Sequence, residues 1–191
     1  MLSGFSLPSS LPRKPRKIAV FISGGGSTLQ ALLEMHHQLD VAIVVTSKRS
    51  ATGIFKAKRF GKKIVFLDKM MGLDSLNEIL KEHRIELLIL AGFMKLLPSK
   101  FVEIWKDRIL NIHPSLLPKY PGLSAAENSY RDNADMGVTI HKVITEMDAG
   151  PVLRQQIALT EPKNLTFNEA SLFLRRTEQS LLRELALRYC A

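Results

Sequence analysis

Residues 17–113 alternate between short apolar runs and segments with helical spacing, and this alternation constrains the fold more than any other feature of the sequence. Each strand–helix–strand unit implies a right-handed crossover. The pattern therefore predicts an α/β fold with a mostly parallel, twisted sheet and helices on both faces. The predicted strands are 17–22, 41–46, 63–67, 86–91 and 108–113, and the predicted helices are 29–35, 53–60, 73–83 and 96–105.

The pattern changes after residue 113. Prolines and glycine in residues 115–135 predict a long loop with one helix near residues 125–130. Residues 137–145 and 152–159 alternate in polarity, and we expect them to form a hairpin-like pair at the far side of the sheet. Apolar residues at helical spacing in 166–189 predict an amphipathic C-terminal helix.

The length of 191 residues, 46% of them hydrophobic, suits one sizeable core. We expect a single domain over residues 17–191, preceded by a flexible basic tail over residues 1–16. That tail lacks the apolar segment of a secretory signal, and the longest apolar run, residues 87–91, is far shorter than the roughly 18 residues of a membrane span. Cys190 is the only cysteine, which excludes an internal disulfide. These features predict a cytoplasmic protein that does not cross a membrane.

The sequence is basic, with 27 Lys and Arg against 18 Asp and Glu, and the excess is concentrated between residues 47 and 69. Such an excess suits nucleic acid or small polyanions such as phosphates and polyglutamates. The aromatic residues of this segment, Phe55, Phe60 and Phe66, are expected in the core and not on a stacking surface. A solvated helix surface is therefore the favoured interpretation, and nucleic acid is not expected as a partner.

A glycine-rich loop, Gly24 to Thr28, connects the first predicted strand to the first predicted helix. Backbone amides and the positive end of the helix dipole face an anion in that position, and the hydroxyls of Ser27 and Thr28 add donors. The loop therefore predicts a phosphate site. It is not the dinucleotide fingerprint, which would require glycine at Leu29, and no lysine follows as in a P-loop. A tight turn without a ligand is the alternative.

Asn111 and His113 lie two residues apart near the end of a predicted strand, so their side chains share one side of the sheet. A carboxamide can donate to a developing oxyanion, and an imidazole can relay a proton near neutral pH. Asp148, in a turn after another strand, can orient His113 or stabilise its charge. The three residues predict acyl transfer. Structural roles, or a metal site formed by His113, His141 and Asp148, are the alternatives.

Longer motifs resemble those of the formyltransferases that use 10-formyltetrahydrofolate, and within that family the enzymes that formylate glycinamide ribonucleotide. The resemblance extends from about Lys17 to Leu159. It is most specific in the Asn-Ile-His-Pro-Ser-Leu-Leu-Pro run that begins at Asn111. It implies a Rossmann-like formyltransferase fold. The other matching segments are Ile22–Ser27, Leu90–Lys95 and Asp148–Val152.

The resemblance implies roles for several groups of residues. The catalytic positions are Asn111, His113 and Asp148. The positions that hold the substrate phosphate are Gly26, Ser27 and Thr28. The folate-lining positions are Met94, Lys95, Leu96, Leu97, Asn111 and Ile144. Near the amino end of the substrate lies Glu178.

Three positions depart from the motifs of the family. Gly25 and Thr28 occupy the two positions where the phosphate loop commonly has asparagine, and Lys95 stands where arginine is usual. Residues 124–128 also lack the His- and Gln-containing pattern of the most similar enzymes. These departures bear on phosphate affinity and substrate fit.

The implied reaction is direct attack of the glycyl amine of glycinamide ribonucleotide on the formyl carbon, in de novo purine biosynthesis. The folate is a cosubstrate, no metal is implied, and the protein would be a monomer or a homodimer. Formyltetrahydrofolate hydrolase shares the Asn, His and Asp set, with water as acceptor. Formyltransferases that act on a sugar nucleotide or an aminoacyl-tRNA are further alternatives. The non-enzyme alternative is a folate- or RNA-binding module.

Overall fold

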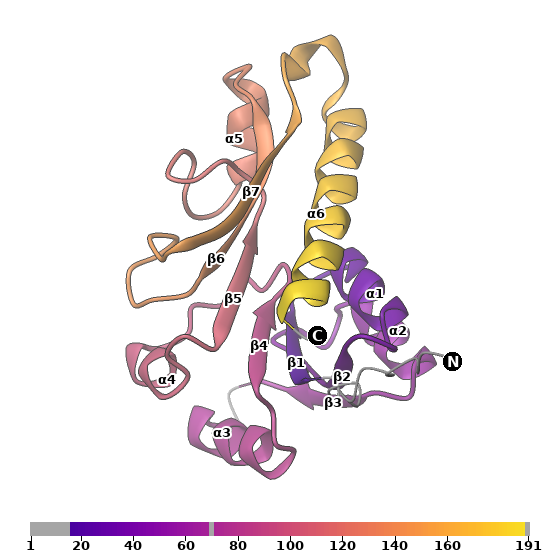
Figure 1. Ribbon diagram of the computed structural model, residues 1–191, viewed down its shortest axis with the longest axis vertical. Helices are drawn as coiled ribbons and strands as arrows, with labels where there is room; N and C mark the ends of the chain where they lie inside the picture. Colours follow the sequence, from indigo (N-terminus) through magenta and orange to yellow (C-terminus); the bar gives the residue numbers. More distant parts are fainter. Residues whose placement is uncertain (1–15, 69–70, 190–191) are drawn as a thin grey trace, which may run out of the picture.

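The computed structural model describes residues 16–68 and 71–189, and its elements follow the predicted order (Figure 1). The tail expected over residues 1–16 lies outside the described residues except for residue 16, and so does Cys190. The strands are β1 (Lys17–Ile22), β2 (Asp40–Thr46), β3 (Lys63–Phe66), β4 (Leu87–Leu90), β5 (Ile109–His113), β6 (Met136–Lys142) and β7 (Val152–Leu159). The helices are α1 (Ser27–Glu34), α2 (Gly53–Arg59), α3 (Leu73–Glu82), α4 (Ser99–Ile104), α5 (Ala125–Arg131) and α6 (Phe167–Tyr189), with a 3-10 turn at Pro162–Asn164.

The seven strands of the described residues form one sheet in the order β3-β2-β1-β4-β5-β6-β7. The first five are parallel, whereas β6 and β7 are antiparallel to their neighbours. The prediction of a mostly parallel sheet with a hairpin at one side is confirmed. The strand order reverses between β1 and β4, and ligands of open α/β sheets bind outside the strand ends near such a point.

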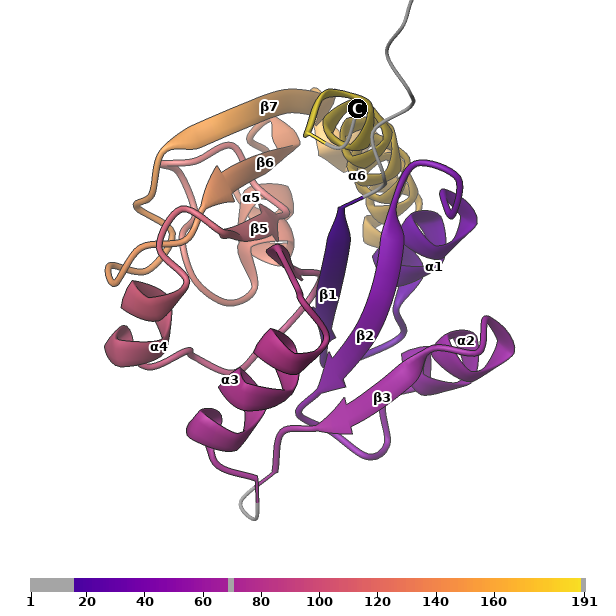
Figure 2. The same cartoon turned by 60° about the horizontal axis from the view of Figure 1, so that its bottom comes forward.

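Helices cover both faces of the twisted sheet (Figure 2). The helices α1, α2, α5 and α6 pack on one face, and α3 and α4 pack on the other. Adjacent residues of β1 contribute to both cores: Val20 belongs to the core on the α1 side, and Phe21 belongs to the core on the α3 and α4 side. The central strands are therefore buried on both sides, as their continuous apolar runs require.

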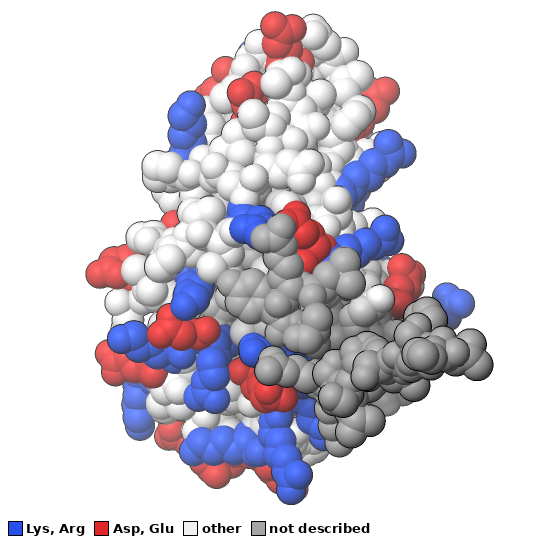
Figure 3. All heavy atoms as spheres, in the orientation of Figure 1, with Lys and Arg blue, Asp and Glu red and all other residues white. Residues whose placement is uncertain are grey.

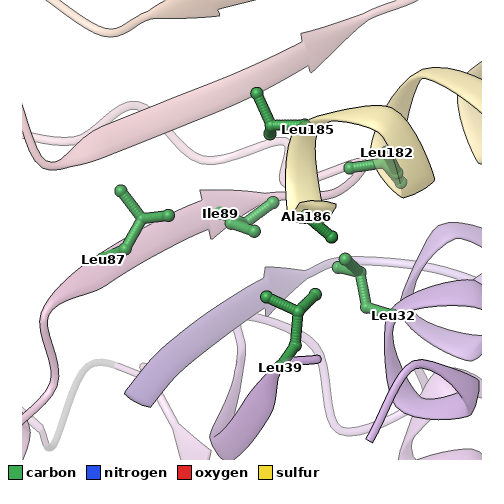
Figure 4. Close-up of a pocket in the computed structure, with 7 residues that line it drawn as sticks. All are labelled: Leu32, Leu39, Leu87, Ile89, Leu182, Leu185 and Ala186. Carbon is green, nitrogen blue, oxygen red and sulfur yellow. The ribbon is translucent and has the colours of Figure 1, made fainter. Parts of the chain in front are cut away.

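A small apolar void lies where α1, β4 and α6 meet (Figure 4). Its volume of about 10 Å³ is close to the minimum for one water molecule, and its lining has no polar side chain. It is a packing defect of the core and not a ligand site. The lining residues are Leu32, Leu39, Leu87, Ile89, Leu182, Leu185 and Ala186.

Most element boundaries lie within two residues of the prediction, and two differ by three. The helix expected over 96–105 begins at Ser99, because Pro98 disfavours a helical conformation at the residue before it. The strand expected over 137–145 ends at Lys142, because Pro151, opposite it, has no N–H for the ladder. Residues 143–151 then form a long connection that contains Asp148.

The expectation that Phe55 lies in the core is wrong, since its side chain is 70% exposed. The short helix α2 buries Gly53, Ile54 and Ala57, and Phe55 lies off that face. In the described part of the chain, no helix is both long and apolar enough to cross a membrane.

Candidate functional site

Side chains from two antiparallel strands meet near the end of β5. Asn111 and His113 lie on β5, and the register pairs Asn111 with His141 of β6. Asp148 follows in the β6–β7 connection, with a φ of 52° in the left-handed region that aspartate adopts more readily than most residues. This conformation directs its carboxylate toward the strands.

The Asp148 carboxylate joins three segments that are distant in sequence. Its Oδ2 atom accepts a hydrogen bond from the Gly122 amide at 2.7 Å and lies 3.5 Å from His113 Nδ1. Its Oδ1 atom accepts from Asn111 Nδ2 at 3.3 Å and lies 3.5 Å from His141 Nε2. The structure thus brings together Asn111, His113 and Asp148, the three residues singled out from the sequence.

Backbone carbonyls fix which nitrogen of each ring carries a proton. His113 Nε2 lies 2.8 Å from the Tyr120 carbonyl, which can only accept, so Nε2 carries the proton of the neutral ring and Nδ1 carries none. By the same reasoning His141 Nδ1 donates to the Lys142 carbonyl at 2.9 Å. Its Nε2 is then free to accept from Asn111 Nδ2 at 3.1 Å. In their neutral forms the two histidines therefore each present an unprotonated ring nitrogen on the side of Asp148.

Asp148 is negatively charged over the whole neutral range. Burial acts to raise its pKa, but the adjacent His141 ring, the hydrogen bond from the Gly122 amide and the positive charge of a protonated His113 together lower the pKa to about 2. Since the pKa lies below the ordinary 3.8, this carboxylate stabilises the fold above that pH, and the contribution is lost as the pH falls toward 2.

His141 is the member of the cluster that sequence reasoning missed, since it was considered only as a metal ligand. An antiparallel register between residues 109–113 and 136–142 would have paired it with Asn111. Within residues 16–68 and 71–189, no group of three His, Cys, Asp or Glu side chains has the arrangement of a metal site.

The glycine loop leads into α1 as predicted, with Gly26 as the N-cap at a φ of 63°. Ser27 opens the helix, and the Thr28 hydroxyl donates to Glu178 Oε2 of α6 at 3.2 Å. Burial raises the pKa of Glu178 to about 7, although the Thr28 hydrogen bond and the charge of Arg175 lower it. Glu178 therefore lies at the predicted phosphate loop and titrates near neutral pH.

The raised pKa of Glu178 predicts a pH-dependent stability. Between the ordinary pKa of 4.5 and about 7, the unfolded chain loses the proton while the folded chain retains it, so the free energy of unfolding falls as the pH rises. The Glu178→Gln protein has no carboxyl to ionise and so lacks this loss. The free energy of unfolding of the variant relative to wild type should therefore rise by up to about 3 kcal/mol from pH 5 to pH 8. Urea unfolding at both pH values measures this gain. If the two proteins differed in free energy of unfolding by the same amount at both pH values, the raised pKa of Glu178 would be contradicted.

Most of the predicted folate-lining residues are exposed. In the segment after β4, Met94 and Leu96 are 66% and 72% exposed, and in the β6–β7 connection Ile144 is 37% exposed. Leu97 differs, because it packs against the core on the α3 and α4 side. Beside this segment is an open cavity of about 410 Å³ that is lined by Ser47, Lys48, Leu67, Asp68, Met94 and Lys95.

The basic segment between residues 47 and 69 is partly engaged in contacts. Arg49 forms an ion pair with Asp68 at 2.8 Å and lies over the Phe66 ring, and Lys63 Nζ lies 3.0 Å from His83 Nε2. On the face shown in Figure 3, positive and negative residues are interspersed over the lower part. The charge on this face is therefore not gathered into one continuous basic patch.

Comparison with known proteins identifies the family. The family model described as "Formyl transferase" matches residues 16–184. The phosphoribosylglycinamide formyltransferase of Haemophilus influenzae is 38% identical over 152 residues, which cover 73% of this chain and 71% of that protein. The human trifunctional purine biosynthetic protein adenosine-3 is 34% identical over 158 residues, which cover 77% of this chain but only 16% of that much longer protein.

A solved structure agrees with these relatives. The phosphoribosylglycinamide formyltransferase of Coxiella burnetii superposes with a TM-score of 0.85 at 27% identity, over 93% of this chain and 88% of that chain. The family match extends over residues 16–184 and the Haemophilus enzyme is 38% identical, so the sequence and the fold indicate the same family. The chain belongs to the formyl transferase family.

Proposed function

We propose that this protein transfers the formyl group of 10-formyltetrahydrofolate to the glycyl amine of glycinamide ribonucleotide, in purine biosynthesis. The observation that carries the proposal is the convergence of Asn111, His113 and His141 on the Asp148 carboxylate in a chain of this family. The names of the relatives support the acceptor. We also infer a cytoplasmic location and one formyltransferase domain over residues 17–191, in keeping with the single sheet.

The reaction makes one bond and breaks another. The amine nitrogen attacks the formyl carbon, the bond from this carbon to the folate N10 breaks, and one proton passes from the amine to N10. Between these steps the formyl oxygen carries a negative charge, so hydrogen-bond donors directed at this oxygen lower the barrier. The protein forms no covalent intermediate.

Asn111 supplies the first donor to the oxyanion. One proton of its Nδ2 is directed to His141 Nε2 at 3.1 Å, which fixes the orientation of the amide. The second is directed to Asp148 Oδ1 over the longer distance of 3.3 Å and is the proton available to an oxyanion. In this scheme His141 is a positioning residue, because it acts through Asn111.

His113 supplies the second donor and moves the proton. Protonation at Nδ1 gives an imidazolium 3.5 Å from Asp148 Oδ2, where the carboxylate stabilises the charge. The imidazolium can then donate to the oxyanion or pass its proton toward N10 through water. Asp148 remains ionised throughout, since its pKa is about 2.

The remaining roles are proposals supported by position. Gly26, Ser27 and Thr28 form the helix N-terminus that would hold the substrate phosphate, with Glu178 beside them. Exposed apolar and basic side chains after β4 would line the folate, and Leu97 would support them from the core. The folate-lining residues are Met94, Lys95, Leu96, Asn111 and Ile144.

The test is absorbance-monitored release of folate from 10-formyltetrahydrofolate, with and without glycinamide ribonucleotide. We expect turnover only when the nucleotide is present. Release without an acceptor would instead identify a hydrolase. Absence of release under both conditions, in a folded protein, would contradict the proposal and favour another acceptor or a binding module.

A further inference from the structure

A phosphate on the substrate requires more positive charge than the glycine loop provides. A phosphomonoester carries about −1.5 to −2 charges at pH 7, whereas a helix N-terminus contributes about +0.5. Gly25 offers no side chain, and the Thr28 hydroxyl donates to Glu178. Glu178 itself adds negative charge when it ionises. A cation at this loop would offset the difference.

The start of α2 packs directly against the loop. The Gly53 amide donates to the Gly24 carbonyl at 3.1 Å. A Cβ atom on Gly53 would lie 2.7 Å from Ile22 Cδ1 and 3.2 Å from the Gly26 Cα, and a Cβ on Gly26 would lie 2.9 Å from the Gly53 Cα. Only glycine at both positions allows the two backbones to approach this closely. The close approach in turn determines which residue of α2 lies over the loop.

That residue is Lys56, which lies three positions after Gly53 and thus near the same face of the helix. Its partly buried side chain donates from Nζ to the Gly26 carbonyl at 3.1 Å. The same peptide group contains the Ser27 amide that opens α1. Because the C=O and N–H of a trans peptide point in opposite directions, the flexible Lys56 side chain would rotate away from the carbonyl to reach a phosphate at that amide. The hydrogen bond to the Gly26 carbonyl uses one of the three protons of the Lys56 ammonium group.

The position is unfavourable for a lysine in the absence of an anion. A cation near a helix N-terminus opposes the macrodipole, whereas an anion between the two is stabilised by both. The Gly26 carbonyl already accepts the first helical hydrogen bond, from the Gln30 amide at 3.0 Å, so the helix does not need Lys56 to satisfy this group. The arrangement therefore suits a bound anion better than it suits the free fold.

We propose that Lys56 binds the phosphate of the substrate and offsets the missing side-chain donors of the loop. This inference rests on the proposed function, because that function supplies the phosphate. It adds a charged side chain from α2 to a site otherwise made of backbone amides and hydroxyls.

The test measures binding of ribose 5-phosphate by calorimetry to wild type, Lys56→Met, Lys56→Arg and Lys58→Met. Lys58 lies on the same helix with an exposed side chain, so its substitution removes equal charge away from the loop. Lys56→Met should bind about 10- to 100-fold more weakly, since a charge-assisted hydrogen bond is lost, while the other two variants bind like wild type. In turnover, Lys56→Met should raise KM for glycinamide ribonucleotide and leave kcat within about twofold.

Equal binding by Lys56→Met and wild type would overturn the inference, and so would a wild type that does not bind ribose 5-phosphate. If Lys56→Arg and Lys56→Met lost the same amount of affinity, the effect would come from packing and not from charge, and the inference would be overturned as well. Because the binding measurement needs no formyl transfer, a missing turnover with intact Lys56-dependent binding would refute the proposed function alone.

Discussion

Replacement of His113 by alanine is expected to reduce kcat by about 10²- to 10⁴-fold while the sheet stays folded. The substitution removes the Nδ1 atom that lies 3.5 Å from Asp148 Oδ2 and is proposed to carry the proton. The Tyr120 carbonyl loses its His113 donor and keeps only a share of the Ser115 hydroxyl proton, which lies 3.2 Å from it and 2.7 Å from the Lys119 carbonyl, so the loss of stability should be about 1 to 3 kcal/mol. Single-turnover formyl transfer with circular dichroism on the same sample separates the two effects.

His83→Ala is the matched control for this experiment. His83 lies after α3, outside the cluster, with its Nδ1 atom 2.9 Å from the Ile79 carbonyl of the preceding turn. The control should turn over like wild type. Full turnover in folded His113→Ala would exclude a proton-transfer role for this ring.

Replacement of Gly150 by alanine should disrupt both stability and activity. A Cβ atom at this position would overlap the Lys142 carbonyl oxygen and lie 2.9 Å from the carbonyl carbon. Because both neighbours are backbone, the turn itself must move, and overpacking of this severity costs about 3 kcal/mol or more. Movement of the turn carries Asp148 away from His113 and His141, so the remaining folded protein should also lose most of its turnover.

Gly72→Ala provides the comparison, since a Cβ there meets no atom within 4 Å and the Gly72 φ of −67° suits any residue. Urea midpoints of the two variants and of wild type give the difference in stability. A Gly150→Ala protein with the midpoint and turnover of wild type would show that the turn can shift without displacing Asp148.

Most of the fold could be predicted because hydrophobic periodicity reports burial. The run Lys17–Ile22 is a strand and the pattern from Phe167 is a helix, as expected. Periodicity does not report which strands pair. The position of β4 beside β1 and the register that sets Asn111 against His141 depend on contacts between distant segments.

The candidate site was predictable only where side-chain chemistry identified it. Asn111, His113 and Asp148 have reactive groups, and the sequence placed them near strand ends. The Gly122 amide and the Tyr120 carbonyl, which hold Asp148 and His113, are backbone groups that any residue possesses. No residue type in the loop after β5 could therefore indicate them, and their role follows from the path of the chain alone.

The site lies where the parallel part of the sheet meets the antiparallel part. Because of this location, the protein can lose activity before it unfolds. Asn111 and His113 belong to the last parallel strand, whereas His141 belongs to the first antiparallel one. A transient detachment of the β6–β7 hairpin would dismantle the cluster and leave the β3-β2-β1-β4 half intact, as sub-global openings do in other domains. Loss of activity under mild denaturant is then expected before loss of the β3-β2-β1-β4 half of the sheet.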